Sequence, residues 1–335
     1  MIDVKRFGSD TWNSLGILVA GLLALFVPFT TLVGSYLILG PVHYLTEIRW
    51  IARKNYFFGS SSWPVVAGLA TAAVAIPPLL YYNLLPLLDD PATLKAGLEW
   101  WSRWSNAAIV IAFAWPLLNM TVANGRVRKI GMVVIVVLAL IMNNAASYKL
   151  WIGLMLPTLI HVYFFTLLFM IQGNMKKGAR KWIGWTNVLA VIIVPILLVI
   201  IPSEMIHLEI PVIVKEGMDQ IGMINLNAQL QAMMGLSDGK SFFFYEPQGI
   251  MVQRVLAFAY LHHYLNWFAK TSVIGWHREI SKRQAFQLIA MISVLIALYF
   301  LKFSLGLRLA IALSFLHVFL EFPVNIQSTK ALFKR

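Results

Sequence analysis

The segment Phe258-Ala259-Tyr260-Leu261-His262-His263-Tyr264-Leu265-Asn266-Trp267 combines an apolar helical pattern with two adjacent histidines and an asparagine. In a helix that crosses lipid, such polar side chains are costly and usually serve a function. Successive residues of a helix are about 100° apart, so His262 and His263 cannot point the same way. We therefore expect one of them to be a ligand and the other to bridge, to be a second ligand or to bond a carboxylate.

Two other apolar segments share a His-x-x-x-Glu pattern. Gly40-Pro41-Val42-His43-Tyr44-Leu45-Thr46-Glu47 lies near the N-terminus, and Ser314-Phe315-Leu316-His317-Val318-Phe319-Leu320-Glu321 lies near the C-terminus. Four residues are about one helical turn, so each pair is expected to lie on one face of its helix.

The composition is that of a polytopic membrane protein. Of 335 residues, 59% are hydrophobic and 12% are charged, whereas a soluble domain has about 25% charged residues. The chain has no cysteine, which excludes thiolate metal sites, iron–sulfur clusters and disulfides. Its formal net charge of +13 comes mostly from short loops, as the positive-inside rule predicts, so we expect no nucleic-acid partner.

The predicted fold is all-α, a transmembrane bundle of about ten spans. The alternative has nine, with one long first helix to about Leu37 followed by a partly embedded helix. We expect a single transmembrane domain over residues 1–335 in the cytoplasmic membrane, with an extracytoplasmic loop or cap at 202–248. The ten predicted spans are 13–28, 31–51, 64–86, 105–123, 130–148, 150–172, 182–201, 249–269, 284–303 and 305–322.

This topology places the unusual polar groups of three helices at the same, cytoplasmic end of the bundle. Imidazole and carboxylate ligands without thiolate suit iron, manganese or zinc, and bundle cores hold such sites between facing helices. We therefore predict one or two metal ions, with non-haem iron as the expected metal. The predicted metal ligands are His43, Glu47, His161, His262, His263, His317 and Glu321.

Simpler explanations exist for several of these residues. A lone membrane histidine such as His161 is often hydrogen-bonded to a neighbouring helix, and Glu321 near an interface can reach toward water. His207 is expected to be solvated in the external loop. His277 and Glu279 are expected either to cap the site or to form an ion pair at the membrane surface.

Aromatic and amide side chains flank the predicted ligands. Trp50, Tyr264 and Trp267 fit an aromatic belt at the membrane surface. With Asn266, they are also our candidates for a slot that binds an apolar substrate.

As a class, the histidine-rich segments resemble membrane non-haem iron oxygenases such as desaturases and hydroxylases, although His-x-x-x-His and His-x-x-His-His boxes are absent. Gly40-Pro41-Val42-His43, with His262, His263 and His317, resembles the Brp/Blh-type membrane carotene dioxygenases. That resemblance implies a histidine-held iron that adds oxygen to a carotenoid double bond. Glu47 and Glu321 depart from its all-histidine site.

Three functions follow as hypotheses. The first is a metal-dependent oxygenase, hydroxylase or desaturase that acts on a lipidic substrate and receives electrons from a protein on the cytoplasmic side. The second is a haem protein with two histidine axial ligands. The third is a transporter with a proton relay of histidine and glutamate.

Overall fold

The structure is a computed structural model that describes residues 8–54, 62–143, 145, 149–176, 182–203, 209–271, 275 and 280–333. The described residues form helices and connecting segments without a strand, which confirms the all-α prediction. His207, His277 and Glu279 lie outside the described residues, and their predictions stay open. The chain divides into two compact units, each made of two separate stretches, and the single-domain prediction stays a prediction.

Among the described residues, six helices are long and apolar enough to cross a membrane, in agreement with a membrane protein. They are Ser9–Phe26, Trp63–Leu87, Leu150–Met175, Trp182–Ile200, Lys282–Leu301 and Phe303–Leu332. The prediction of about ten spans is not supported. The four predicted spans without a counterpart are 31–51, 105–123, 130–148 and 249–269.

Each of these four segments has a feature that sets it apart from a membrane-spanning helix. The 31–51 region is divided among α2 (Pro28–Gly34), a five-residue π-helical turn (Ser35–Leu39) and α3 (Gly40–Lys54). Helix α6 (Ser105–Thr121) has only 17 residues, and α7 (Gly125–Met142) has three cations in its first turn and a half. Helix α13 (Pro247–Ala269) has 23 residues, but its glutamines, arginine and histidines lower its hydropathy.

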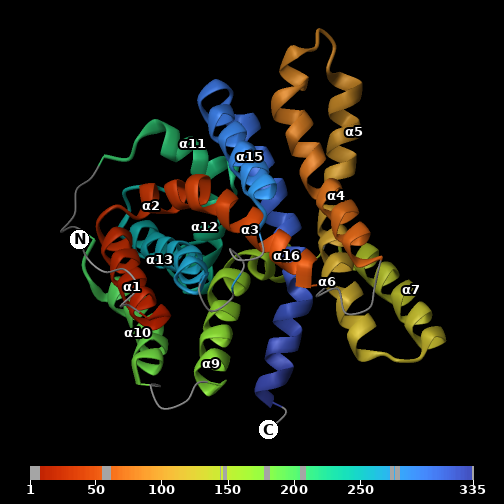
Figure 1. The fold of residues 1–335 in the computed structure, drawn as a ribbon. Coiled ribbons are helices and arrows are strands. Elements are labelled where there is room, and N and C mark those ends of the chain that lie inside the picture. The colour runs from red at the N-terminus through yellow and green to blue at the C-terminus, as the bar shows by residue number, and fades with distance from the viewer. Residues whose placement is uncertain are drawn as a thin grey trace. The chain divides into compact units, whose positions relative to one another are not determined.

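The first unit comprises Met1–His43 and Leu159–Ala285 and is built around α13. Helices α1 (Ser9–Phe26), α2, α10 (Trp182–Ile200) and α12 (Met223–Met233) all pack against α13, so most of its side chains are buried (Figure 1). Helix α9 (Thr166–Lys176) packs against α10 and continues a π-helical stretch, Lys149–Phe165. A Cβ atom at Gly16 would lie 3.3 Å from Cβ of Leu265. Because glycine has no side chain, α1 approaches α13 closely at Gly16.

The predicted cap at 202–248 contains two helices in its described part. Helix α11 (Val212–Gln220) packs against α2, and α12 packs against α13. The buried side chain of Asn227 donates hydrogen bonds from Nδ2 to the carbonyl oxygen of Gly249 (3.0 Å) and to Oε1 of Gln253 (3.2 Å). These bonds fix α12 on the N-terminal half of α13.

The second unit comprises Tyr44–Thr158 and Phe286–Arg335. Helix α16 (Phe303–Phe333) packs against α4 (Trp63–Asn83) and α6, and α4 packs against α5 (Ala92–Ser102). Most of α3 and of α15 (Lys282–Leu301) belongs to this unit. Large apolar side chains such as Ile141, Phe286 and Phe300 are exposed on α7 and α15.

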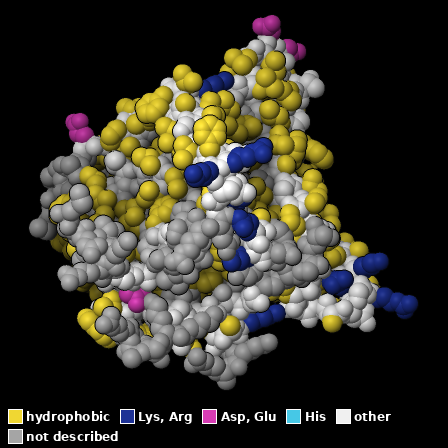
Figure 2. Space-filling view, in the orientation of Figure 1, with side chains coloured by type: hydrophobic (Ala, Val, Ile, Leu, Met, Phe, Trp, Pro, Cys, Tyr) yellow, Lys and Arg dark blue, Asp and Glu magenta, His cyan; other side chains and the backbone are white. Residues whose placement is uncertain are grey.

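Figure 2 shows hydrophobic side chains over much of the visible surface of the described residues. Large exposed apolar areas are rare on soluble monomers. Exposed apolar helix faces are instead what a hydrocarbon environment favours.

Candidate metal-binding clusters

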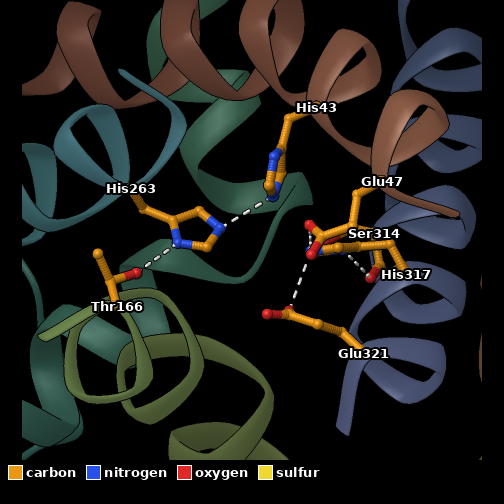
Figure 3. A network of polar contacts seen from close by, with 7 residues as sticks. All are labelled: His43, Glu47, Thr166, His263, Ser314, His317 and Glu321. Carbon is orange, nitrogen blue, oxygen red and sulfur yellow. Dashed lines mark hydrogen bonds and ion pairs between the residues drawn. The ribbon is translucent and has the colours of Figure 1, made fainter. Parts of the chain in front are cut away.

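Two histidines of the first unit face each other directly. Nε2 of His43, from the start of α3, lies 3.0 Å from Nε2 of His263 on α13, and their rings are nearly perpendicular (Figure 3). Both side chains are buried. At this distance one nitrogen carries the hydrogen and the other accepts it with its lone pair. If that hydrogen is lost, both nitrogens can instead bind a cation.

The other ring nitrogen of His263 has a hydroxyl partner. Oγ1 of Thr166, at the start of α9, lies 2.8 Å from Nδ1 of His263 (Figure 3). A threonine hydroxyl both donates and accepts, so it serves either tautomer of the ring. When it accepts from Nδ1, Nε2 of His263 is left with the lone pair that a metal ion requires.

His161 completes the histidine cluster, which we define as His43, His161 and His263. Its ring centroid lies 5.2 Å from that of His263, and its side chain is only 2% exposed. The three imidazoles come from three different helical segments. The chain therefore concentrates neutral nitrogen ligands in the interior of this unit.

His262 is buried but points elsewhere. Its ring stacks on Phe258 of the same helix, with centroids 5.6 Å apart and planes 7° apart. Only His263 of the adjacent pair joins the histidine cluster, as the 100° spacing along a helix requires. His262 is not part of the histidine cluster, and its role as a metal ligand stays a prediction.

The second unit holds a different cluster, Glu47, His317 and Glu321, which we call the His/Glu cluster. Nε2 of His317 lies 3.8 Å from Oε2 of Glu47 and 3.9 Å from Oε2 of Glu321 (Figure 3). All three side chains are buried, with exposures of 1% for His317, 3% for Glu47 and 5% for Glu321. Helices α3 and α16 supply them.

A backbone contact fixes the tautomer of His317. Its Nδ1 lies 2.8 Å from the carbonyl oxygen of Ser314, and a carbonyl oxygen can only accept, so Nδ1 carries a hydrogen. Tyr44 stacks on the ring, with centroids 4.6 Å apart, and holds its plane. In a neutral His317, the lone pair of Nε2 therefore faces two carboxyl groups.

The charges within the His/Glu cluster favour a cation. Two ionised carboxylates and one imidazole have a net charge of −2 when the ring is neutral and −1 when it is protonated. Buried charge is costly unless it is compensated. A divalent cation makes the set neutral, and the three ligand atoms also provide the oxygen and nitrogen donors that such ions prefer.

The spacing of these atoms agrees with metal binding better than with hydrogen bonding. Distances of 3.8 and 3.9 Å exceed those of a hydrogen bond. Two ligands of a tetrahedral ion, each bound at about 2.1 Å, are separated by about 3.4 Å. His317 and Glu321 are among the buried side chains whose ligand atoms lie close enough together to hold a metal ion, and Glu47 is a further carboxyl group beside His317.

Both predicted His-x-x-x-Glu pairs lie on continuous helices. His43 and Glu47 are one turn apart on α3, and His317 and Glu321 are one turn apart on α16. The prediction that the histidine cluster and the His/Glu cluster share one centre, at the cytoplasmic end of a bundle, stays a prediction.

The predicted substrate residues have varied surroundings. Tyr264 and Trp267 are buried, and each ring centroid lies 5.4 Å from that of His43. Asn266 is also buried, while Trp50 is half-buried. Their role in binding an apolar substrate stays a prediction.

Two residues that contact the clusters were not predicted from the sequence. Thr166 follows His161 by five residues in an apolar stretch, and nothing in its surroundings marks it as a hydrogen-bond partner of His263. Tyr44 follows His43 directly, and nothing in the sequence marks it as a partner of His317. In the structure its ring stacks on His317.

Comparisons of the chain with protein-family models, curated proteins and solved structures found no match.

Proposed function

We propose that this chain is a membrane-embedded metalloenzyme of the cytoplasmic membrane, an oxidoreductase that acts on a lipidic substrate. The observation that carries the proposal is the buried convergence of two carboxyl groups and the Nε2 atom of His317. The buried imidazoles of the histidine cluster are a second possible ligand set, within the other unit. One or two ions per chain are expected.

Non-haem iron is the metal that we propose. The ligand set contains nitrogen and oxygen donors without sulfur, which suits iron, manganese or zinc. When bound, iron supplies one-electron and oxygen chemistry that no amino-acid side chain provides. A lipidic substrate fits the apolar surroundings, and an electron-donor protein would supply reducing equivalents.

The side chains around the ligands have separate roles in this proposal. The carbonyl of Ser314 and the hydroxyl of Thr166 orient His317 and His263, so that each presents Nε2. Tyr44 limits rotation of the His317 ring. Burial of both clusters excludes bulk water, which strengthens electrostatic interactions at the ligands.

Two alternatives make different demands. A haem held between His43 and His263 would need room for a macrocycle, whereas their Nε2 atoms are only 3.0 Å apart. A proton relay through the His/Glu cluster fits the same geometry as a metal site. It requires no stoichiometric metal, which separates it from the proposal.

The test is oxygen uptake and product analysis with protein reconstituted in native lipid extract, with and without added ferrous iron. The proposal predicts iron-dependent oxygen consumption and a new oxidised or desaturated lipid. The optical spectrum of the same sample distinguishes haem by its Soret band. Metal-bound protein without any oxidised product would contradict the oxidoreductase proposal and leave the metal site standing.

A further inference from the structure

A pocket of about 510 Å³ opens in the first unit, away from the residues of the histidine cluster. This volume lies within the range of small-molecule sites, about 300–1,000 Å³. Much of its wall is apolar, with Leu25, Phe29, Ile210, Phe244 and Ile250 among the lining residues.

The break between α1 and α2 makes room for this pocket. Helix α1 ends at Phe26, and Pro28 begins α2, so the chain turns at Val27. Proline cannot donate a backbone hydrogen bond and favours the first turn of a helix. The ring centroids of Phe29 and Phe244 are 5.4 Å apart, and this contact builds an aromatic wall on the α2 side.

Positive charge lies beside the apolar wall. Nζ of Lys215, on α11, lies 5.6 Å from the ring centroid of Phe244 and 5.1 Å from that of Tyr245, and both rings line the pocket. Among the described residues, Lys215 has no ion-pair partner. An ammonium group over aromatic faces is attracted to them, while the lysine stem covers apolar surface.

Lys215 itself is not a lining residue, whereas two other ionisable groups, Arg254 and Glu209, line the pocket. Arg254 is fully buried and donates hydrogen bonds to the carbonyl oxygens of Ile201 (2.6 Å) and Pro202 (3.4 Å), so we assign it to holding the wall in place. Glu209 is exposed, and as an anion it would not attract an anionic ligand. Lys215, which lies over two of the lining rings, is therefore the cation that we expect to attract the charged end of a ligand.

We propose that this pocket binds a single-chain lipid with an anionic head group, with its tail against the aromatic wall and its head beside Lys215. The lipid tail alone gives little preference, because hydrocarbon in the bilayer is as apolar as the pocket. Selectivity must therefore come from the head group. The proposal does not depend on the metal centre, and either can fail without the other.

Photo-crosslinking tests the proposal directly. The protein is placed in phosphatidylcholine nanodiscs with a photoreactive fatty acid, and labelled peptides are mapped by mass spectrometry. The proposal predicts labelling within 25–30 and 244–254. It also predicts that dodecanoate or dodecyl phosphate suppresses labelling at about tenfold lower concentration than dodecanol, and the better of the two anions identifies the head group.

Matched variants locate the site. Ile250→Trp fills the pocket and should abolish labelling, whereas Met251→Trp, at a half-buried neighbour on α13 outside the lining, should not. Lys215→Gln should weaken competition by dodecanoate about fivefold, and Lys240→Gln, an exposed lysine elsewhere in the cap, should leave it unchanged.

The Lys215 pair keeps the test decisive if Ile250→Trp does not fold. Equal competition by dodecanoate and dodecanol would overturn the anionic head group. Labelling that is unchanged by Ile250→Trp, or that falls outside the two segments, would contradict the claim that this pocket binds the lipid.

Discussion

The histidine cluster and the His/Glu cluster are both buried, yet they differ in what they require. His43 and His263 can satisfy each other through a shared hydrogen, 3.0 Å between nitrogens, and so need no ion to be stable. Glu47 and Glu321 both approach Nε2 of His317, and when both are ionised they carry more negative charge than one imidazole can neutralise. Without a metal ion, neutral imidazoles leave no charge uncompensated. Two buried carboxyl groups can both ionise at low cost only when a cation compensates their charge.

The largest expected effect is the loss of metal-dependent stability when one carboxyl group of the His/Glu cluster is removed. With metal at a hundredfold excess over its Kd, binding should stabilise the wild-type protein by about 2.7 kcal/mol against unfolding. Glu321→Gln should lose most of this stabilisation. In the metal-free state the same variant should be at least as stable as wild type, because a glutamine amide replaces a carboxyl group that is costly to ionise in this buried site.

Thermal unfolding in nanodiscs, with metal and with chelator, measures both values. Glu99→Gln is the matched control, because Glu99 is an exposed residue of the same unit that pairs only weakly with Lys95. If chelator destabilises Glu321→Gln as much as wild type, the contrast between the two clusters is wrong.

A smaller effect is expected in the histidine cluster, where the ligands are neutral. Thr166→Val keeps the shape of the side chain but removes the hydroxyl that orients His263. Metal affinity should fall about 10- to 100-fold. Thr166→Ser should restore it, and the absorption spectrum of bound Co²⁺ should return with it.

Titration with Co²⁺ provides that measurement. A purely structural role for Thr166 would lower the unfolding temperature of both variants and leave the Co²⁺ spectrum of the folded protein unchanged. Such a result would contradict the role of Thr166 in orienting His263 and would leave it a role in packing alone.

The smallest effect concerns the ring that stacks on His317. Tyr44→Leu preserves an apolar side chain but removes the aromatic stacking, at a cost of about 0.5–1.5 kcal/mol. Metal should still bind, with modestly lower affinity. A complete loss of metal in a folded Tyr44→Leu protein would mean that Tyr44 is part of the ligand set.

Local spacing predicted much of what the structure shows. The two His-x-x-x-Glu pairs lie on single helices, and the two adjacent histidines point in different directions, because both features depend only on helical geometry. Thr166 could not be found in this way, since its contact with His263 joins residues 97 positions apart.

The predicted number of spans is not supported, for a related reason. An apolar pattern does not separate a helix that faces lipid from one enclosed by other helices. Helix α13 is surrounded by α1, α2, α10 and α12, so it can carry glutamine, arginine and histidine that lipid would reject. Around residues 31–51, backbone geometry decides, because the helix is divided by a π-helical turn.

Metal content most directly tests the claim that the His/Glu cluster holds an ion. Wild type, His317→Ala and His262→Ala are purified identically, checked by size-exclusion chromatography and analysed for metals. Both histidines are buried, so both variants should lose stability, on the order of 1–3 kcal/mol. We predict one or two ions per chain in wild type and His262→Ala, and at least one ion fewer in folded His317→Ala. Equal metal in all three proteins, or none in wild type, would contradict the account.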